Sequence, residues 1–176
     1  MTAKQKAVLA NIGAIVIVLG AMAMAWALGG CSARVAHVTN LPAGVTEQQA
    51  KDWDAAVRDL HQIAVTTNAL REAVVAVRTA GSFPDDHAYA VTLESIAKVD
   101  ALQIQAAGFL RQSPNNFGAS QKQVITANVS AIAQELQTLN STGVTGIKDK
   151  ASLSTVNTAL ANLTGWVSVV LNLTSK

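Results

Sequence analysis

The sequence of 176 residues contains one cysteine, Cys31, and three histidines, His37, His61 and His87. A single cysteine excludes an intramolecular disulfide framework, and a zinc site built on cysteine requires several thiolates or a Cys/His cluster. None of the histidines has a second His or Cys three or four positions further on, which is the spacing that places two ligands on one helix face. We therefore expect no metal site and no other cofactor.

Sequence motifs of catalysis are also missing. No serine lies in a Gly-x-Ser-x-Gly elbow, no glycine-rich phosphate loop occurs, and no Glu-x-x-His pair indicates a di-iron bundle. Asp85, Asp86 and His87 precede a helical pattern, and acidic residues in a first turn are favoured by the helix dipole without any metal. Asp52, Asp54 and Asp59 are expected on a solvated helix face. The sequence predicts no catalytic residues, and we expect that the protein is not an enzyme.

Positive charge is not clustered anywhere along the chain. The net charge is +2, and from Arg34 onward 11 Lys and Arg residues balance 11 Asp and Glu residues. A nucleic-acid-binding surface needs gathered cations that displace counterions from phosphates. We therefore do not expect nucleic acid as a partner.

The first of two long stretches without charge is residues 7–33, which follows Lys4 and Lys6. A helix over residues 7–30 would be roughly 36 Å long, enough for a hydrocarbon core of ~30 Å. The apolar part of a secretory signal is shorter, about 7–15 residues. Length thus favours a membrane-spanning helix, with the lysines in the cytoplasm and Trp26 near the opposite interface.

The end of this stretch carries a different signal. Leu28-Gly29-Gly30-Cys31 resembles the lipobox of bacterial lipoproteins, although Gly29 stands where Ala or Ser is commoner and the apolar run is overlong. The resemblance covers residues 1–31 and implies that the Cys31 thiol is diacylated and that residues 1–30 are a removed signal peptide. The alternative is an uncut transmembrane anchor with a cysteine at the membrane edge. Both interpretations place the rest of the chain in the bacterial cell envelope, held at a membrane on its periplasmic or extracellular side.

Residues 31–45 contain Pro42 and Gly44 without a helical period and are predicted to form a tether. Four segments of residues 46–176 then place mostly apolar residues at helical spacing. The four stripes are Ala56, Leu60, Ile63, Thr67, Leu70, Val74 and Val77; Leu93, Ile96, Val99, Leu102, Ala106 and Phe109; Ile125, Val129, Ile132, Leu136 and Leu139; and Leu153, Val156, Leu160, Leu163, Val167 and Val170.

The boundaries between these segments have recognisable signals. Thr46 with Gln49, and Ser120 with Gln123, fit capping boxes, and the turn-rich stretches 81–84, 113–120 and 140–146 separate the helices. No segment alternates with the period of a strand. We predict an all-α protein, in which an N-terminal apolar signal or anchor helix is followed by an up-down-up-down four-helix bundle.

The second stretch without charge is residues 151–175, in the last predicted helix. An exposed helix face normally carries charged residues, whereas 11 of these 25 residues are Ser, Thr or Asn, which makes a poor membrane span. The helix is either a deeply buried strut or a contact surface for another protein, a second copy or lipid headgroups. In the second case the contact residues are Asn162, Trp166, Ser168, Val169 and Leu173. In the bundle this helix would end beside the start of the first helix, near the anchor.

These features predict a membrane-anchored, exported helical bundle that acts by binding or scaffolding. Its partners would be the membrane and a protein, another copy included. Cell-envelope lipoproteins and phage-encoded envelope proteins share this architecture, an analogy of build alone. The alternative is a membrane-active pore or lysis-type protein whose last helix inserts into the bilayer.

Overall fold

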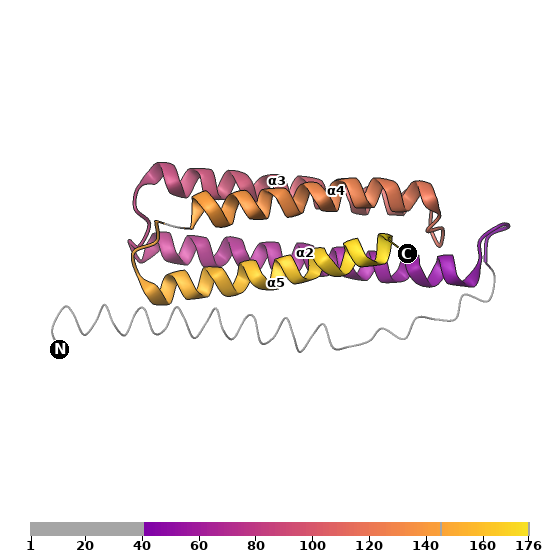
Figure 1. Ribbon diagram of the computed structural model, residues 1–176, viewed down its shortest axis with the longest axis horizontal. Helices are drawn as coiled ribbons and strands as arrows, with labels where there is room; N and C mark the ends of the chain where they lie inside the picture. Colours follow the sequence, from indigo (N-terminus) through magenta and orange to yellow (C-terminus); the bar gives the residue numbers. More distant parts are fainter. Residues whose placement is uncertain (1–40, 145, 176) are drawn as a thin grey trace.

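The computed structural model describes residues 41–144 and 146–175 of the chain (Figure 1). The described chain forms α2 (Glu47–Thr79), α3 (Asp86–Gln112), α4 (Ala119–Thr138) and α5 (Lys150–Thr174), and a five-residue π-helix, η1 (Leu139–Gly143), extends α4. It contains no strand. The predicted all-α class is confirmed for these residues. The predicted N-terminal helix and the tether residues up to 40, Cys31 included, lie outside the described residues.

The helices form a bundle in which each one packs against the next in the chain and α5 closes the ring by packing against α2. Consecutive helices run in opposite directions, with α3 and α4 side by side in one layer and α2 and α5 in the other (Figure 1). Short loops favour antiparallel neighbours of this kind because a short loop cannot carry the chain to the other end of a helix. The C-terminal end of α5 lies alongside the N-terminal part of α2 (Figure 1).

The helix starts follow local capping chemistry. The predicted capping box of α2 is present, with the Thr46 hydroxyl accepting from the Gln49 backbone N–H and the Gln49 side chain accepting from the Thr46 N–H. The predicted box at Ser120 is wrong. Gly118 has the extended backbone of the N-cap, and Ser120 lies inside the first turn of α4, where a residue with helical backbone cannot act as the cap of a capping box.

The predicted stripes of α2 and α4 form the core, since every residue of both is buried. In α3 the buried side differs from the predicted stripe. Leu110 is buried where Phe109 was expected, and Leu93, Leu102 and Phe109 are half-buried. Polar contacts explain part of this difference between the predicted and the observed buried residues. The Gln103 amide donates to the Leu60 carbonyl at 3.2 Å, and Trp53 Nε1 donates to the Leu110 carbonyl at 3.1 Å. The cost of burying Gln103 is thereby offset by a hydrogen bond.

Asp59 also departs from the expectation of a solvated face. It is 4 % exposed, and its Oδ1 accepts from the Arg58 Nε at 3.1 Å, while the Arg58 side chain remains exposed. A buried carboxylate needs such a charged donor. Asp52 and Asp54 are half-buried on the same helix.

The two loops at one end of the bundle are tied together. The Lys148 backbone N–H donates to the Ser82 carbonyl at 3.0 Å, which joins the α4–α5 loop to the α2–α3 loop. Gly146 lies so close to the same loop that an added Cβ would come within 2.6 Å of Pro84 Cγ. Gly81 has a φ of +69°, a conformation that favours glycine and ends α2 where the sequence predicted.

Candidate functional site: a charge-poor face formed by α4 and α5

Charge is unevenly distributed around the bundle. Most charged side chains of the described residues lie on α2 and α3, whereas α4 carries Lys122 and Glu135, and α5 carries only its first residue, Lys150. The fold places α4 and α5 side by side (Figure 1). Two charge-poor helices therefore share one face of the molecule.

The charges of the opposite half are largely satisfied within it. Arg71 pairs with Asp100 and Arg78 with Asp86, and both pairs link α2 to α3. On α3, the hydrogen bond and charge of Glu94 raise the pKa of the Lys98 ammonium above its ordinary value. Glu135 of α4 acts on the pKa of Lys98 in the same direction.

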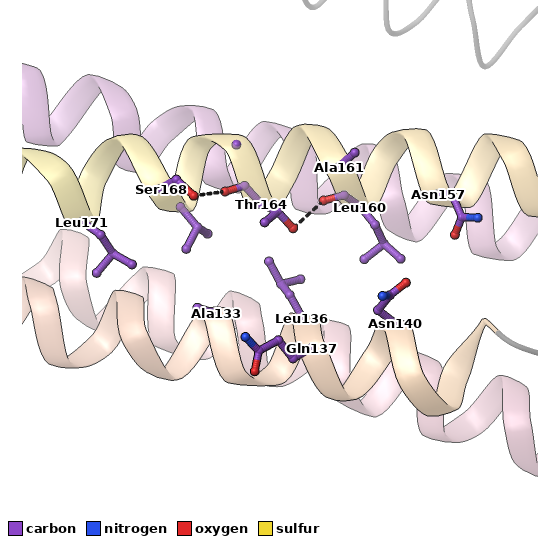
Figure 2. Close-up of a pocket in the computed structure, with 12 residues that line it drawn as sticks. Ala133, Leu136, Gln137, Asn140, Asn157, Leu160, Ala161, Thr164, Ser168 and Leu171 are labelled. Carbon is purple, nitrogen blue, oxygen red and sulfur yellow. Dashed lines mark hydrogen bonds between the residues drawn. The ribbon is translucent and has the colours of Figure 1, made fainter.

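A groove of about 700 Å³ runs between α4 and α5 (Figure 2). Leu136 of α4 and Leu160 and Leu171 of α5 point into it from opposite walls (Figure 2). Its lining contains no charged residue; it consists of Ala133, Leu136, Gln137, Asn140, Asn157, Leu160, Ala161, Thr164, Gly165, Val167, Ser168 and Leu171. The groove is thus an apolar floor bordered by small and uncharged polar side chains.

The hydroxyl groups of α5 are turned back onto their own helix. Thr164 donates to the Leu160 carbonyl at 2.8 Å and Ser168 donates to the Thr164 carbonyl at 3.0 Å (Figure 2). Thr155 and Thr158 make the same bond to the residue four positions earlier. Such back-bonding uses the hydroxyl donor locally. The free-energy cost of removing this face from water is therefore lower than its content of Ser and Thr alone indicates.

The residues predicted as a contact surface are divided by the structure. Ser168 lines the groove, and Val169 is 44 % exposed. Trp166 and Leu173 are half-buried against the core, and Asn162 is also half-buried. At 100° per residue these three lie on the flank of α5 opposite the groove, on the side where α2 packs. The fold does not bring them together with Ser168.

Sequence reasoning missed Ala133 and Gln137 of α4, Asn140 of η1, and the small residues Ala161 and Gly165 of α5, which all line the groove. The signal that could have found them was the scarcity of charge in residues 119–147, whose only charged residues are Lys122 and Glu135.

α5 is the one helix of the described chain that is long and apolar enough to cross a membrane. This is weak support for a span, because a core helix of a soluble bundle meets the same criterion. Only 33 % of the apolar stretch of α5 is buried inside the bundle, so this helix has a large exposed side.

The titratable side chains of the described residues form no group of three or more His, Cys, Asp or Glu that could hold a metal ion. His61 and His87 are exposed and lie on different helices. Comparison of the chain with protein-family models, with curated proteins and with solved structures finds no match.

Proposed function

We propose that this protein is a membrane-anchored, exported helical bundle that acts as a non-enzymatic binding or scaffolding module of the bacterial cell envelope. The observation that supports this proposal is the charge-poor α4–α5 face with its groove, on a bundle whose ion pairs Arg71–Asp100 and Arg78–Asp86 lie between the other two helices. An uncharged face whose Thr164 and Ser168 hydroxyls already donate within α5 is more easily desolvated than a charged one, and it is suited to contact with another macromolecule.

The anchor is argued from the sequence and supported by the direction of the chain. Residues 7–30 are uncharged and mostly apolar and end at the lipobox-like Leu28-Gly29-Gly30-Cys31. The described chain begins at the end of the bundle where α5 also ends (Figure 1). Leu41 is ten positions after Cys31 in the chain, a distance of at most about 36 Å when extended. An anchor at residues 1–31 would therefore keep the C-terminal part of the α4–α5 face near the membrane.

Mass spectrometry of the protein from isolated membranes tests the anchor. We expect the full chain to fractionate with membranes and its mature form to begin at Cys31 with the mass of added acyl chains. Cys31→Ser should then leave the chain unprocessed. An unmodified chain that begins at Met1 would replace the lipoprotein with the uncut span, and a chain found only in the soluble fraction would overturn the membrane-anchored function.

A second candidate function is supported by the length and hydropathy of α5. In this alternative the bundle opens and α5 inserts into the bilayer, as in a pore or lysis-type protein. Release of a dye from vesicles separates the two functions. The binding module leaves the vesicles intact, whereas sustained leakage that depends on residues 150–174 would favour the membrane-active protein.

A further inference from the structure

We propose that the partner seated on the α4–α5 face is a second copy of this chain, and that two copies pair in parallel with their α5 helices crossing at Gly165. This inference rests on the proposed function, because the parallel orientation follows from two copies anchored in the same membrane. It names the partner that the binding face accepts.

The distribution of charge permits pairing of this face with itself. A two-fold interface sets each surface patch against its own copy, so any charge near the centre meets a like charge. The groove lining has no charged residue. Lys122 lies over the Phe117 ring at 5.7 Å, and Lys150 is the first residue of α5. At 100° per residue, Glu135 lies on the side of α4 away from the groove residues Ala133 and Gln137. The centre of the face is thus free of like-charge repulsion.

Gly165 is unexplained by the single chain. It lies in the middle of α5, it is exposed, and an added Cβ there would meet nothing within 4 Å. Its φ is not positive, since only Gly44 and Gly81 have positive φ among the described glycines. Glycine inside a helix is less stable than alanine by roughly 0.5–1 kcal/mol. What glycine offers at such a position is the close approach of another backbone.

The neighbours of Gly165 extend this into a stripe. Exposed residues with small or uncharged side chains follow at steps of three and four along the outer side of α5. They are Thr158, Ala161, Gly165, Ser168 and Asn172. This is the spacing with which one helix packs along another, and small residues at it allow backbones to come close.

The size of the face suits a stable pair. A helix of 25 residues, the length of α5, is about 37 Å long, and two helices packed 8–10 Å apart present a face roughly 20 Å wide. Each copy would then bury on the order of 700 Å², about 1,400 Å² in total, which lies within the range of specific interfaces, ~1,200–2,000 Å². Confinement of both copies to one membrane raises their effective concentration further.

The test compares two glycines in the full chain. Gly165→Leu fills the crossing point, whereas Gly108→Leu changes the other helical glycine whose Cβ position is open, on α3. In sedimentation equilibrium of the detergent-extracted protein, we expect the wild type and Gly108→Leu to form dimers. Gly165→Leu should raise the dimer dissociation constant about fivefold or more, which is the fold-change that corresponds to the typical free-energy cost of overpacking a close contact.

Cysteine cross-linking in native membranes gives a second measurement that does not depend on a bulky substitution. Ser168→Cys lies on the stripe near the two-fold axis of a parallel pair, and Ala97→Cys is an exposed control on α3. We expect an oxidised dimer for the first and none for the second beyond that of the wild type, which controls for a disulfide at Cys31 in any molecules whose Cys31 thiol is not acylated.

Each other outcome is decisive. A wild-type chain that stays monomeric in membranes and in detergent overturns the pairing but leaves the anchored binding module, whereas loss of membrane association overturns the proposed function itself. A dimer insensitive to Gly165→Leu and not cross-linked by Ser168→Cys pairs elsewhere, for example through residues 7–30. If the chain is monomeric and a membrane-impermeant reagent fails to label the thiol of Ser168→Cys, then α5 lies in lipid.

Discussion

The groove between α4 and α5 makes a quantitative prediction about two leucines of one helix. Leu163 is 0 % exposed in the centre of the core, whereas Leu160, 5 % exposed, lines the open groove. Truncation to alanine removes the same atoms from both. The two sites differ only in whether the space that remains is sealed.

The expected difference follows from the cavity term. Loss of the buried side chain is unfavourable by about 2 kcal/mol at either site, and a sealed cavity of ~60 Å³ adds ~1.5 kcal/mol at ~24 cal/mol per Å³. Leu163→Ala should therefore destabilise the bundle by about 3.5 kcal/mol. Leu160→Ala should destabilise it by about 2 kcal/mol, because its space opens into the groove and fills with water.

Urea unfolding followed by circular dichroism measures this difference on a chain shortened to residues 41–176, with Val169→Ala as an exposed control on the same helix. The control should stay within ~0.5 kcal/mol of the wild type, as exposed sites usually do. The measurement is made at the lowest workable protein concentration and repeated at a higher one, because a second copy on the face would cover Leu160. Equal effects of the two truncations at low concentration would refute an open groove beside Leu160.

Three further predictions concern the caps, the glycines and the outer side of α5. The Ser152 backbone N–H lowers the pKa of the Asp149 carboxyl. Asp149 therefore contributes stability above its unfolded pKa of ~3.9, and this contribution is lost as the pH falls through the lower folded pKa. Asp149→Asn should make the melting temperature less dependent on pH over this acid range, and an unchanged pH profile would contradict the cap. Gly165→Ala, in open space within a helix, should stabilise the monomer by about 0.5–1 kcal/mol in thermal unfolding. Gly146→Ala should destabilise it, because its Cβ would come within 2.6 Å of a proline side chain. If both substitutions changed the free energy of unfolding in the same direction, the result would be inconsistent with the packing described. Ser168→Lys should leave helicity and melting nearly unchanged while weakening dimerisation measured by sedimentation, since the two-fold pair sets lysine against lysine; undiminished dimerisation would place the contact elsewhere.

The helices could be predicted because their signals are local. The capping box at Thr46 needs only residues three positions apart, and Gly81 ends α2 through its own φ of +69°. The stripes of α2 and α4 point into the core because their spacing alone places them on one side of a helix. The N-cap of α4 could not be predicted in the same way, because the residue at this position, Gly118, has no side chain to form a capping hydrogen bond.

The sequence could not show which residues of α3 are most buried. Leu93, Leu102 and Phe109 have the spacing of a core stripe, but Gln103 finds an acceptor in the Leu60 carbonyl and Leu110 offers one to Trp53. These partners lie 43 and 57 positions away in the chain. A buried polar side chain is tolerated only where such a partner exists, so the buried side of α3 includes Gln103 and Leu110.

By itself the sequence determined that the chain after residue 45 is helical, where its helices begin and end to within a few residues, and that residues 151–175 carry no charge. Those properties arise from neighbours within one or two turns. Only the tertiary structure decided that this uncharged helix lies beside α4, with a groove between them, and that Trp166, Asn162 and Leu173 fall on the flank away from Ser168. The physical reason is that a helix has a single core stripe but two flanks, and which neighbour covers each flank is set by the packing order of the whole bundle.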